Sequence, residues 1–266
     1  MNILDEIIAH KKRELTRKTA RTTIRSLEGR KLFKRQPLPM THFILNPDRT
    51  GIIAEFKRKS PSRGIINTGV SVEEVTTGYF RSGASALSIL TDYTYFGGKE
   101  TDLIRARELN PIPILRKDFI LDEYQIIETK SLGADAILLI AAVLSGDQVL
   151  NLGRCAHSLG LQVLLEIHGR EELDRLCEFV DMVGVNNRDL KTFEVDTEIS
   201  FKLAELIPGE FVRISESGIS SPGIVRKLKG AGYHGFLIGE NFMRAPDPVV
   251  AFSDFVKLML FEHDQD

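Results

Sequence analysis

From residue 51 onward, the chain repeats one simple unit, a short apolar run followed by a longer amphipathic stretch. Apolar runs of this length, rich in Ile, Val and Leu and bounded by turn residues, are typical of buried β-strands. They begin every 20 to 35 residues: GIIAEFK (51–57), ALSILTD (86–92), PILRKDF (113–119), AILLIA (136–141), QVLLEIH (162–168), MVGVNNRD (182–189), FVRISES (211–217) and GFLIGEN (235–241). The stretches between them have helical spacing, and several end in glycine, a common helix stop. Strands that alternate with helices in this way form a parallel sheet.

Eight strand–helix units fit a closed (β/α)8 barrel, the TIM barrel, for which about 250 residues is typical. The chain has 266 residues, enough for one such barrel. A doubly wound open sheet is the alternative, but it usually has fewer strands and often opens with a glycine-rich dinucleotide loop, which this sequence lacks. We therefore predict a single α/β domain over residues 1–266. It is a (β/α)8 barrel with an N-terminal helical extension, residues 1–50, that covers the barrel mouth.

The extension combines an apolar stripe with a strongly basic stretch. The segment Lys11–Arg35 carries eleven Lys or Arg against two Glu. One interpretation is a helix pair packed on the barrel with a solvated outer face, and the other is a lid whose positive field attracts an anionic substrate. An RNA-binding arm is disfavoured, because no aromatic residue precedes Phe33. The apolar positions at helical spacing are Ile3, Leu4, Ile7, Ile8 and Leu15.

Composition excludes several other classes of protein. The formal net charge of -2 provides no general attraction to nucleic acid or to an anionic membrane. No apolar run approaches the roughly 20 residues of a membrane span, and the N-terminus lacks the pattern of a signal peptide, so we expect a cytoplasmic protein. Cys155 and Cys177 both fall in helical patterns, and we expect buried free thiols rather than a disulfide or a metal pair.

Charged residues gather where the predicted strands end, and the run PILRKDF is the extreme case, with Arg116, Lys117 and Asp118 in succession. Side chains along a strand alternate between its two faces. Lys117 should therefore point into the barrel mouth with Leu115 and Phe119. Arg116 and Asp118 should lie on the other side, where they can bond neighbouring loops and helix ends.

Other predicted strands show the same feature at the same level. A single such residue is more often a salt-bridged rim residue than a catalyst, but four strands together favour an active site at the carboxyl ends of the barrel. Lysines among carboxylates suit general acid and base chemistry and make a poor divalent metal site, so we expect no metal. We expect His168 at the rim as a supporting residue. The additional inward candidates are Glu55 and Lys57, Glu166, Asn186 with Arg188, and Glu216.

The last two strands run into glycine-containing turns, SESGIS and LIGEN, that lead to helices. Backbone N–H groups at such turns and at helix N-termini bind phosphate, and the loops after strands 7 and 8 are the frequent phosphate site of this fold. Plain glycine turns are the alternative. The presence of both turns at the expected place favours a phosphorylated small-molecule substrate.

Taken together, six motifs closely resemble the indole-3-glycerol phosphate synthase family of tryptophan biosynthesis. They are IAEFKRKSPSRGII, ALSILTDYTYFGG, PILRKDFILDEYQI, VGVNNRDLKTFEVD, SESGI and LIGENFMRAPDP. The resemblance covers essentially the whole chain, including the N-terminal LDEIIAHKK. The combination of KxSPSxG, LRKDF and NNRDL is highly specific, although any one of them alone would be weak.

This resemblance implies a lyase that acts on 1-(2-carboxyphenylamino)-1-deoxyribulose 5-phosphate. An aromatic ring carbon attacks the ribulose C2 carbonyl and closes a five-membered ring, and loss of carbon dioxide and then water yields indole-3-glycerol phosphate. The resemblance implies neither a cofactor nor a metal. Contacts with other enzymes of tryptophan biosynthesis are a further expectation.

The resemblance also implies residue roles. Lys117 matches the general acid that protonates the carbonyl oxygen, Glu166 the carboxylate that removes a proton in the dehydration, and Lys57 the lysine that contacts the substrate carboxylate and can donate to the departing hydroxyl. Three further catalytic positions hold these groups and the substrate hydroxyls: Glu55, Asn186 and Glu216. The expected substrate-binding residues are Ser60 in the loop after the first strand, Arg188, and the apolar walls Phe96 and Phe119. The expected phosphate-binding residues are Ser217, Gly218, Gly239 and Glu240.

Glu240 departs from a serine found in some relatives. A carboxylate beside a phosphate would be repelled, so we expect its side chain to point away while its backbone N–H binds. Two rival functions stay open on the residues alone. One is a Schiff-base aldolase that uses Lys117 or Lys57. The other is a non-catalytic binder of phosphoribosyl ligands.

Overall fold

The computed structural model describes residues 3–189 and 192–261, and its centre is a closed barrel of eight parallel strands. Each strand pairs with the next along the chain, and β1 pairs with β10 to close the ring. The barrel strands are β1 (Ile52–Phe56), β4 (Ala86–Leu90), β5 (Ile114–Lys117), β6 (Ala136–Ile140), β7 (Gln162–Ile167), β8 (Met182–Asn186), β9 (Val212–Glu216) and β10 (Gly235–Ile238). The predicted (β/α)8 barrel is therefore confirmed, and the open-sheet alternative is wrong.

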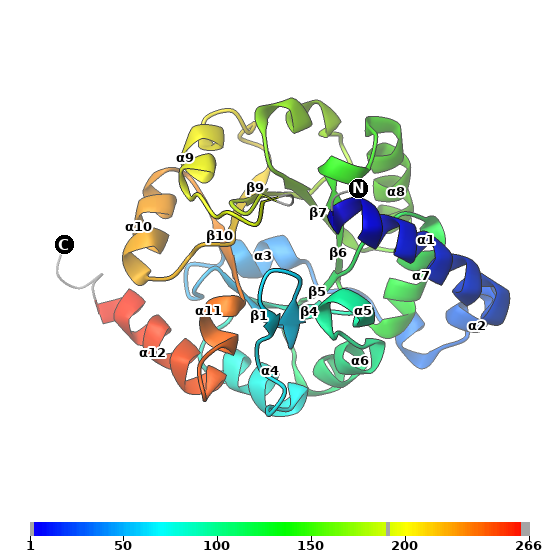
Figure 1. Cartoon of the computed structure of the whole chain (residues 1–266), viewed down its shortest axis with the longest axis horizontal. Coiled ribbons are helices and arrows are strands. Elements are labelled where there is room, and N and C mark those ends of the chain that lie inside the picture. Colours follow the sequence, from blue (N-terminus) through cyan, green and yellow to red (C-terminus); the bar gives the residue numbers. More distant parts are fainter. Residues whose placement is uncertain (1–2, 190–191, 262–266) are drawn as a thin grey trace.

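Helices surround the barrel as an outer ring (Figure 1). Serine or aspartate side chains cap the N-termini of several of them and bond otherwise unpaired backbone N–H groups, as Ser71 does for α4 and Asp122 for α7. The helices that follow the barrel strands are α4 (Val72–Arg81), α5 (Tyr93–Phe96), α6 (Glu100–Leu109), α7 (Glu123–Leu132), η2 (Ala141–Val143), α8 (Gly146–Ser158), η3 (Arg170–Arg175), α9 (Glu198–Ala204), α10 (Pro222–Gly230), α11 (Glu240–Met243) and α12 (Pro248–Phe261). A small antiparallel hairpin, β2 (Lys59–Ser60) and β3 (Gly64–Ile65), interrupts the connection after β1.

Two apolar cores follow from the alternation of side chains along the strands. Outward residues such as Ile114 and Val163 pack against the helices in the larger core. Inward residues such as Ile53 and Leu164 fill the barrel interior in the smaller one. The interior is thus a packed core, and charged inward residues gather near the carboxyl ends of the strands.

The N-terminal extension contacts both ends of the barrel. Its elements are α1 (Ile3–Arg21), α2 (Ile24–Glu28), η1 (Lys31–Lys34) and α3 (Met40–Leu45). Met40 and Ile44 of α3 join the interior core and close the end opposite the carboxyl ends of the strands. Figure 1 shows α1 in front of the barrel and α3 behind it.

The predicted boundaries differ from the observed ones mainly at the carboxyl ends of the strands. The predicted run 113–119 ends as a strand at Lys117, and the run 162–168 ends at Ile167. The residues beyond these points leave the sheet to build the loops, a boundary that an apolar pattern does not define. Both cysteines are free thiols, as predicted. The predicted burial is wrong, because both are only partly buried, and Cys177 lies outside any helix whereas Cys155 lies in α8.

The outward charges of β5 form a buried ion network, as the alternation predicts. The Arg116 side chain is 1% exposed, and its Nη2 lies 3.1 Å from Asp118 Oδ2 and 2.7 Å from Glu128 Oε2 on α7. The guanidinium also donates to the Thr129 hydroxyl and the Gln125 carbonyl. One cation therefore joins β5 to α7 behind the strand end.

We expect Arg116→Leu to lower the free energy of unfolding by about 3–5 kcal/mol, because it removes one of the two cations that pair with each of two buried carboxylates. Urea denaturation measures the change. Arg105→Leu is the matched control, since Arg105 is half-exposed and its two ion pairs are with exposed glutamates. That control should change stability by no more than about 0.5 kcal/mol. Equal losses in the two variants would contradict the importance of the network.

Candidate active site

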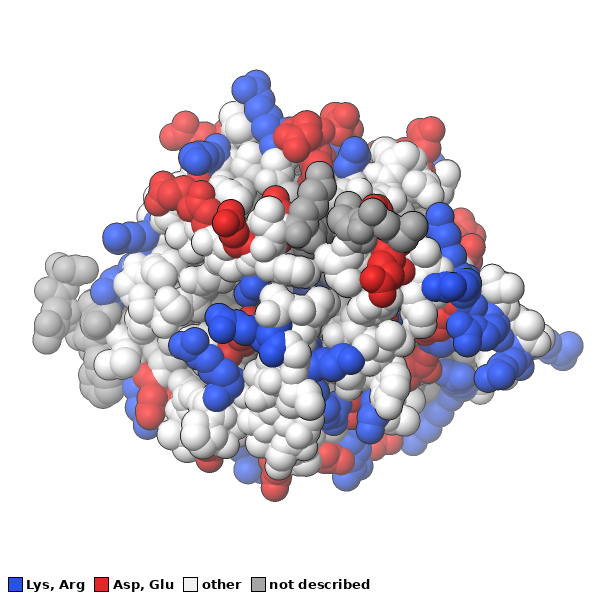
Figure 2. All heavy atoms as spheres, viewed as in Figure 1, with Lys and Arg blue, Asp and Glu red and all other residues white. Residues whose placement is uncertain are grey.

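A cavity of about 340 Å³ opens at the carboxyl ends of the barrel strands. Lys and Arg side chains gather around the hollow at the centre of this face (Figure 2). The cavity lining includes every residue that the sequence assigned to the site: Glu55, Lys57, Ser60, Phe96, Lys117, Phe119, Glu166, Asn186, Arg188, Glu216, Ser217, Gly218, Gly239 and Glu240. The structure thus brings these residues together, while their roles remain predictions.

Lys117 occupies the centre of the polar part of the cavity. Its Nζ lies 2.9 Å from Glu166 Oε2 and 2.7 Å from Glu216 Oε2. All three side chains are buried or nearly so, which makes these charge-assisted hydrogen bonds stronger than their surface counterparts. One ammonium group is therefore held between two carboxylates that come from β7 and β9.

The charge states of this triad are set by burial and mutual attraction. Burial disfavours the charged form of Lys117, but Glu166, Glu216 and Glu55 outweigh it and raise the pKa of the ammonium group. Burial also opposes ionisation of Glu166, yet Lys117 and His168 lower the pKa of that carboxyl group. Burial and the charge of Glu166 raise the pKa of Glu216 to about 7 in spite of Lys117. At neutral pH, Lys117 is charged, Glu166 is ionised and Glu216 is partly protonated.

His168 lies behind the carboxylate of Glu166 and is absent from the cavity lining. Its Nε2 is 3.5 Å from Glu166 Oε1, and its Nδ1 is 3.5 Å from Glu172 Oε2. Burial lowers the pKa of His168, but the two glutamates outweigh it and raise the pKa overall. Protonation of the imidazole is therefore easier beside these glutamates than in a free histidine, and its predicted supporting role stays a prediction.

A second lysine–carboxylate pair stands at the end of β1. Lys57 Nζ lies 2.7 Å from Glu55 Oε1. At the end of β8, Asn186 Oδ1 accepts hydrogen bonds from the Ser217 hydroxyl at 2.8 Å and from the Arg188 backbone N–H at 3.0 Å. The polar groups thus hold one another in place before any ligand enters.

Two inward glycines make room for the carboxylates. A Cβ atom at Gly184 in β8 would collide with Glu216 Oε1, and one at Gly239 would collide with the Glu55 side chain. Only glycine allows such a close approach without moving the buried acid. These glycines therefore set how far Glu55 and Glu216 reach toward the centre.

Aromatic and aliphatic side chains form the other walls of the cavity. The rings of Phe96 and Phe119 are tilted by 40° with centroids 6.1 Å apart. Several apolar lining residues were missed by the sequence reasoning: Leu138 and Leu237 at the floor, and Phe193 in the loop after β8. Inward alternation could have identified Leu138 and Leu237. Nothing in the sequence pattern singles out Phe193.

The N-terminal helix α1 contributes to the cavity and is anchored beside it. Ile3, Leu4 and Ile7 line the cavity. One turn further on, Lys11 is 2% exposed, and its Nζ lies 2.9 Å from both Asp92 and Asp118. For this lysine, the expectation of a solvated basic face is wrong. Asp92 caps α5, which carries Phe96, and Asp118 precedes Phe119, so Lys11 joins α1 to both aromatic walls.

The turn after β9 has an unusual backbone. Ser217 has φ 66° and Gly218 has φ 75°. A left-handed conformation is uncommon for a residue other than glycine, and it is often found at functional sites. The bond from Ser217 to Asn186 helps to hold this turn against the end of β8.

Glu240 begins α11 after β10, the strand next to β9, and its carboxylate is paired with two arginines. Oε1 lies 3.1 Å from Arg63 Nε, and Oε2 lies 3.1 Å from Arg188 Nη2. Arg63 belongs to the β2–β3 hairpin, and its part in the site was missed even though it follows the SPS motif directly. Whether the carboxylate also avoids a bound phosphate, as the sequence led us to expect, stays a prediction.

Two surveys of residues 3–189 and 192–261 gave negative results. No group of three or more His, Cys, Asp or Glu side chains is arranged to hold a metal ion. None of the helices in these ranges is both long and apolar enough to cross a membrane.

Comparison with known proteins gives one family. The family model for indole-3-glycerol phosphate synthase matches residues 4–255. An indole-3-glycerol phosphate synthase from Bacteroides thetaiotaomicron is 48% identical over 256 residues, which cover 96% of this chain and 98% of the relative. The enzyme of the same name from Acetivibrio thermocellus is 42% identical and matches over 91% and 95% of the two chains.

Solved structures match the fold at much lower identity. A tryptophan synthase α-subunit from Pyrococcus furiosus has a TM-score of 0.61 at 14% identity and covers 80% of this chain and 99% of that one. The 3-hexulose-6-phosphate synthase from Salmonella typhimurium has a TM-score of 0.58, also at 14% identity, with the same coverage of the two chains. These likenesses support the barrel fold alone.

We expect Glu216→Gln to gain stability relative to the parent chain as the pH rises from about 4.5 to above 7. The folded-state pKa of Glu216 lies above its ordinary value of 4.5, so the native state binds this proton more tightly than the unfolded state. The resulting stabilisation is complete below pH 4.5 and is lost as the pH rises through about 7, whereas an amide has no proton to lose. Urea midpoints for both proteins between about pH 5 and pH 8 measure the difference. A gap that does not change with pH would contradict the assignment.

Proposed function

The chain belongs to the indole-3-glycerol phosphate synthase family, and on that premise we propose which of its side chains carry each step of the family's reaction. The activity is that of a carboxy-lyase in tryptophan biosynthesis, which converts 1-(2-carboxyphenylamino)-1-deoxyribulose 5-phosphate to indole-3-glycerol phosphate. The observation that carries the proposal is the position of Lys117, a protonated ammonium group between two buried carboxylates in the cavity.

Lys117 is the general acid of ring closure. As the aromatic carbon forms a bond to the ribulose C2 carbon, the carbonyl π electrons move to oxygen, and the Lys117 ammonium group gives that oxygen a proton. The raised pKa ensures that the donor is charged when the substrate arrives, and its charge stabilises the developing oxyanion. Loss of carbon dioxide returns the bonding electrons to the aromatic ring.

Glu166 is the base of the dehydration. The hydroxyl formed in the first step leaves as water after it takes a proton, while Glu166 accepts a proton from the substrate so that the double bond can form. Its lowered pKa keeps it ionised and ready to accept. Lys57 contacts the substrate carboxylate and can supply the proton to the departing hydroxyl. Glu55 holds Lys57 in place for this role.

The remaining cavity residues position the substrate. Phe96 and Phe119 hold the anthranilate ring against the reacting carbonyl, a placement that accounts for much of the rate in a ring closure. Asn186 and Glu216 hold the reacting groups and the substrate hydroxyls. The other expected contacts are Ser60 and Arg188 to the substrate, and the backbone of Ser217, Gly218, Gly239 and Glu240 to the phosphate.

A Schiff-base aldolase is less well supported by the same cavity. A lysine that attacks a carbonyl must be neutral, which requires a lowered pKa. The neighbours of Lys117 instead raise its pKa. We therefore expect borohydride reduction in the presence of substrate to leave no covalent lysine adduct. An adduct on Lys117 or Lys57, detected by mass spectrometry, would overturn the acid–base assignment.

We propose the cytoplasm as the place of action, because the phosphorylated substrate carries charges that keep it from crossing a membrane. We also propose residues 1–50 as a cover of the mouth within one domain, supported by the cavity contacts of Ile3, Leu4 and Ile7. Association with other enzymes of tryptophan biosynthesis remains a prediction.

We expect Lys117→Met and Glu166→Gln each to lower kcat by at least ~100-fold, the scale of a lost general acid or base. The chain has no tryptophan, so the fluorescence of the indole product can be followed against a low protein background. Lys117→Arg is the informative companion, because it preserves the positive charge between the two glutamates but is too weak an acid to donate. It should fold normally and be as inactive as Lys117→Met.

The control for these assays is Lys257→Met, which removes an exposed lysine on α12 paired only with Asp254. Its kcat should equal that of the parent chain. An active Lys117→Arg variant would remove Lys117 from the acid role and leave charge stabilisation as its only contribution.

A further inference from the structure

The connection after β1 folds into a hairpin at the cavity rim, and its tip is tied to the start of α11 and to the loop after β8. The hairpin pairs Lys59 with Ile65 and Ser60 with Gly64. Its turn residues line the cavity, although Ile65 on the other side of the hairpin is 74% exposed. With so little apolar surface buried, the hairpin depends on polar contacts to stay in place.

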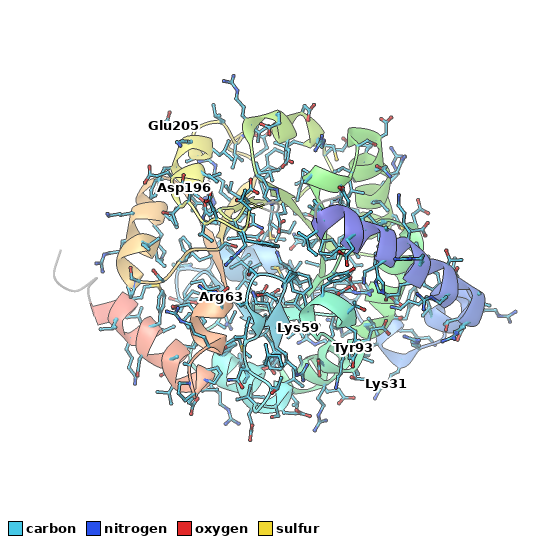
Figure 3. All side chains as sticks on the ribbon, in the orientation of Figure 1. Lys31, Lys59, Arg63, Tyr93, Asp196 and Glu205 are labelled. Carbon is cyan, nitrogen blue, oxygen red and sulfur yellow. The ribbon has the colours of Figure 1, made fainter. Side chains whose placement is uncertain are left out.

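Lys59 at the base of the hairpin donates to the Thr94 carbonyl, and the contacts of the tip centre on one carboxylate. Glu240 accepts from Arg63 through Oε1 and from Arg188 through Oε2, each at 3.1 Å. Arg188 also donates to the Ser62 hydroxyl at 3.4 Å, so it too contacts the hairpin turn. Three segments of the chain, the hairpin, the end of β8 and the start of α11, therefore meet at Glu240. In Figure 3, Arg63 lies on the side of the hairpin that faces α11.

The location of this cluster matters because Glu240 directly follows Gly239 and lines the same cavity as Ser217 and Gly218. A phosphate held by the backbone of these residues would lie beside the Glu240 carboxylate. The two anions would repel each other, and both would attract the same two guanidinium groups. Guanidinium binds carboxylate and phosphate with the same fork of N–H groups, and a dianion is the stronger partner.

We propose that Glu240 is a positioning residue that takes the place of the substrate phosphate in the unliganded protein. Its carboxylate holds Arg63 and Arg188 at the rim and keeps the hairpin docked. When the substrate arrives, its phosphate displaces the carboxylate and takes over both arginines. This inference rests on the phosphate site proposed above and adds to it a competition within the protein.

The competition between phosphate and the Glu240 carboxylate for the two arginines has two measurable consequences. Part of the attraction between phosphate and the arginines is offset by the lost contacts to Glu240, so the carboxylate weakens phosphate binding. The same carboxylate protects the hairpin in the absence of ligand. Removing its charge should therefore strengthen phosphate binding and loosen the free hairpin.

Inorganic phosphate is the probe, and the full-length parent chain, Glu240→Gln and Glu205→Gln are compared. Glu205 is an exposed residue after α9 on the outer ring, so its substitution makes the same charge change away from the cavity (Figure 3). We expect the Ki of phosphate as a competitive inhibitor to fall by about 3- to 10-fold in Glu240→Gln. The KM should fall in parallel with kcat less affected, and Glu205→Gln should match the parent.

Limited digestion with trypsin provides the second readout, since Arg63 precedes Gly64 at the hairpin turn. Without phosphate, cleavage after Arg63 should be faster in Glu240→Gln than in the parent, and saturating phosphate should remove the difference. Equal thermal melting of the three proteins shows that the readouts report on the rim and not on global unfolding.

The outcomes that would contradict the proposal distinguish the role of Glu240 from the phosphate site itself. Equal Ki values in all three proteins, or a higher Ki in Glu240→Gln, would overturn the placeholder role while leaving the phosphate site intact. A hairpin cleaved at the same rate in all three would overturn the docking role. Failure of phosphate to inhibit any of them would instead reject the phosphate site on which the inference rests.

Discussion

The alternation of side chains along β5 is the constraint on which the active site depends. Arg116 and Asp118 face outward into an ion network with α1 and α7, while Lys117 between them faces the cavity. A helix could not separate three consecutive charges so completely, because neighbouring residues on a helix project only about 100° apart. The ion network of Arg116 therefore fixes the end of β5 and, with it, the position of Lys117.

Burying charged groups costs free energy unless each has a partner of opposite charge. In this site, each buried lysine is paired with more than one carboxylate. Lys117 forms ion pairs with Glu166 and Glu216, and Lys11 forms ion pairs with Asp92 and Asp118. The two carboxyl groups beside Lys117 differ in their pKa. Glu166 is ionised at neutral pH, whereas burial and the charge of Glu166 make Glu216 titrate near pH 7.

The fold and the inward polar residues could be predicted from sequence because both depend on local periodicity. Eight apolar runs predict eight strands, and counting by two from Leu115 places Lys117 in the mouth. The burial of Lys11 could not be predicted in this way. Its partners Asp92 and Asp118 lie far along the chain, and a lysine on a basic helix has the same local pattern whether it is solvated or buried.

The ion pairs of Glu240 could not be predicted from the sequence either. The sequence indicated that a carboxylate stands at a turn where phosphate is expected, but not that Arg63 and Arg188 meet it there. Contacts between loops depend on the closure of the barrel, which brings together residues that are 177 and 52 positions apart in the chain. The apolar floor of the cavity could have been predicted, since Leu138 and Leu237 follow the same period of two as the inward polar residues.

The course of the N-terminal extension, from α1 at one end of the barrel to α3 at the other, has a consequence for how the chain is made. The backbone N–H of Leu38 bonds Asp135, and that of Thr41 bonds Gln162, 97 and 121 residues later. A ribosome releases the extension first, yet it finds its permanent neighbours only after half of the barrel has emerged. The extension therefore cannot complete its docking until these partners have emerged, and its apolar stripe is exposed in the meantime. The eleven Lys and Arg residues of Lys11–Arg35 favour the solubility of such an exposed segment.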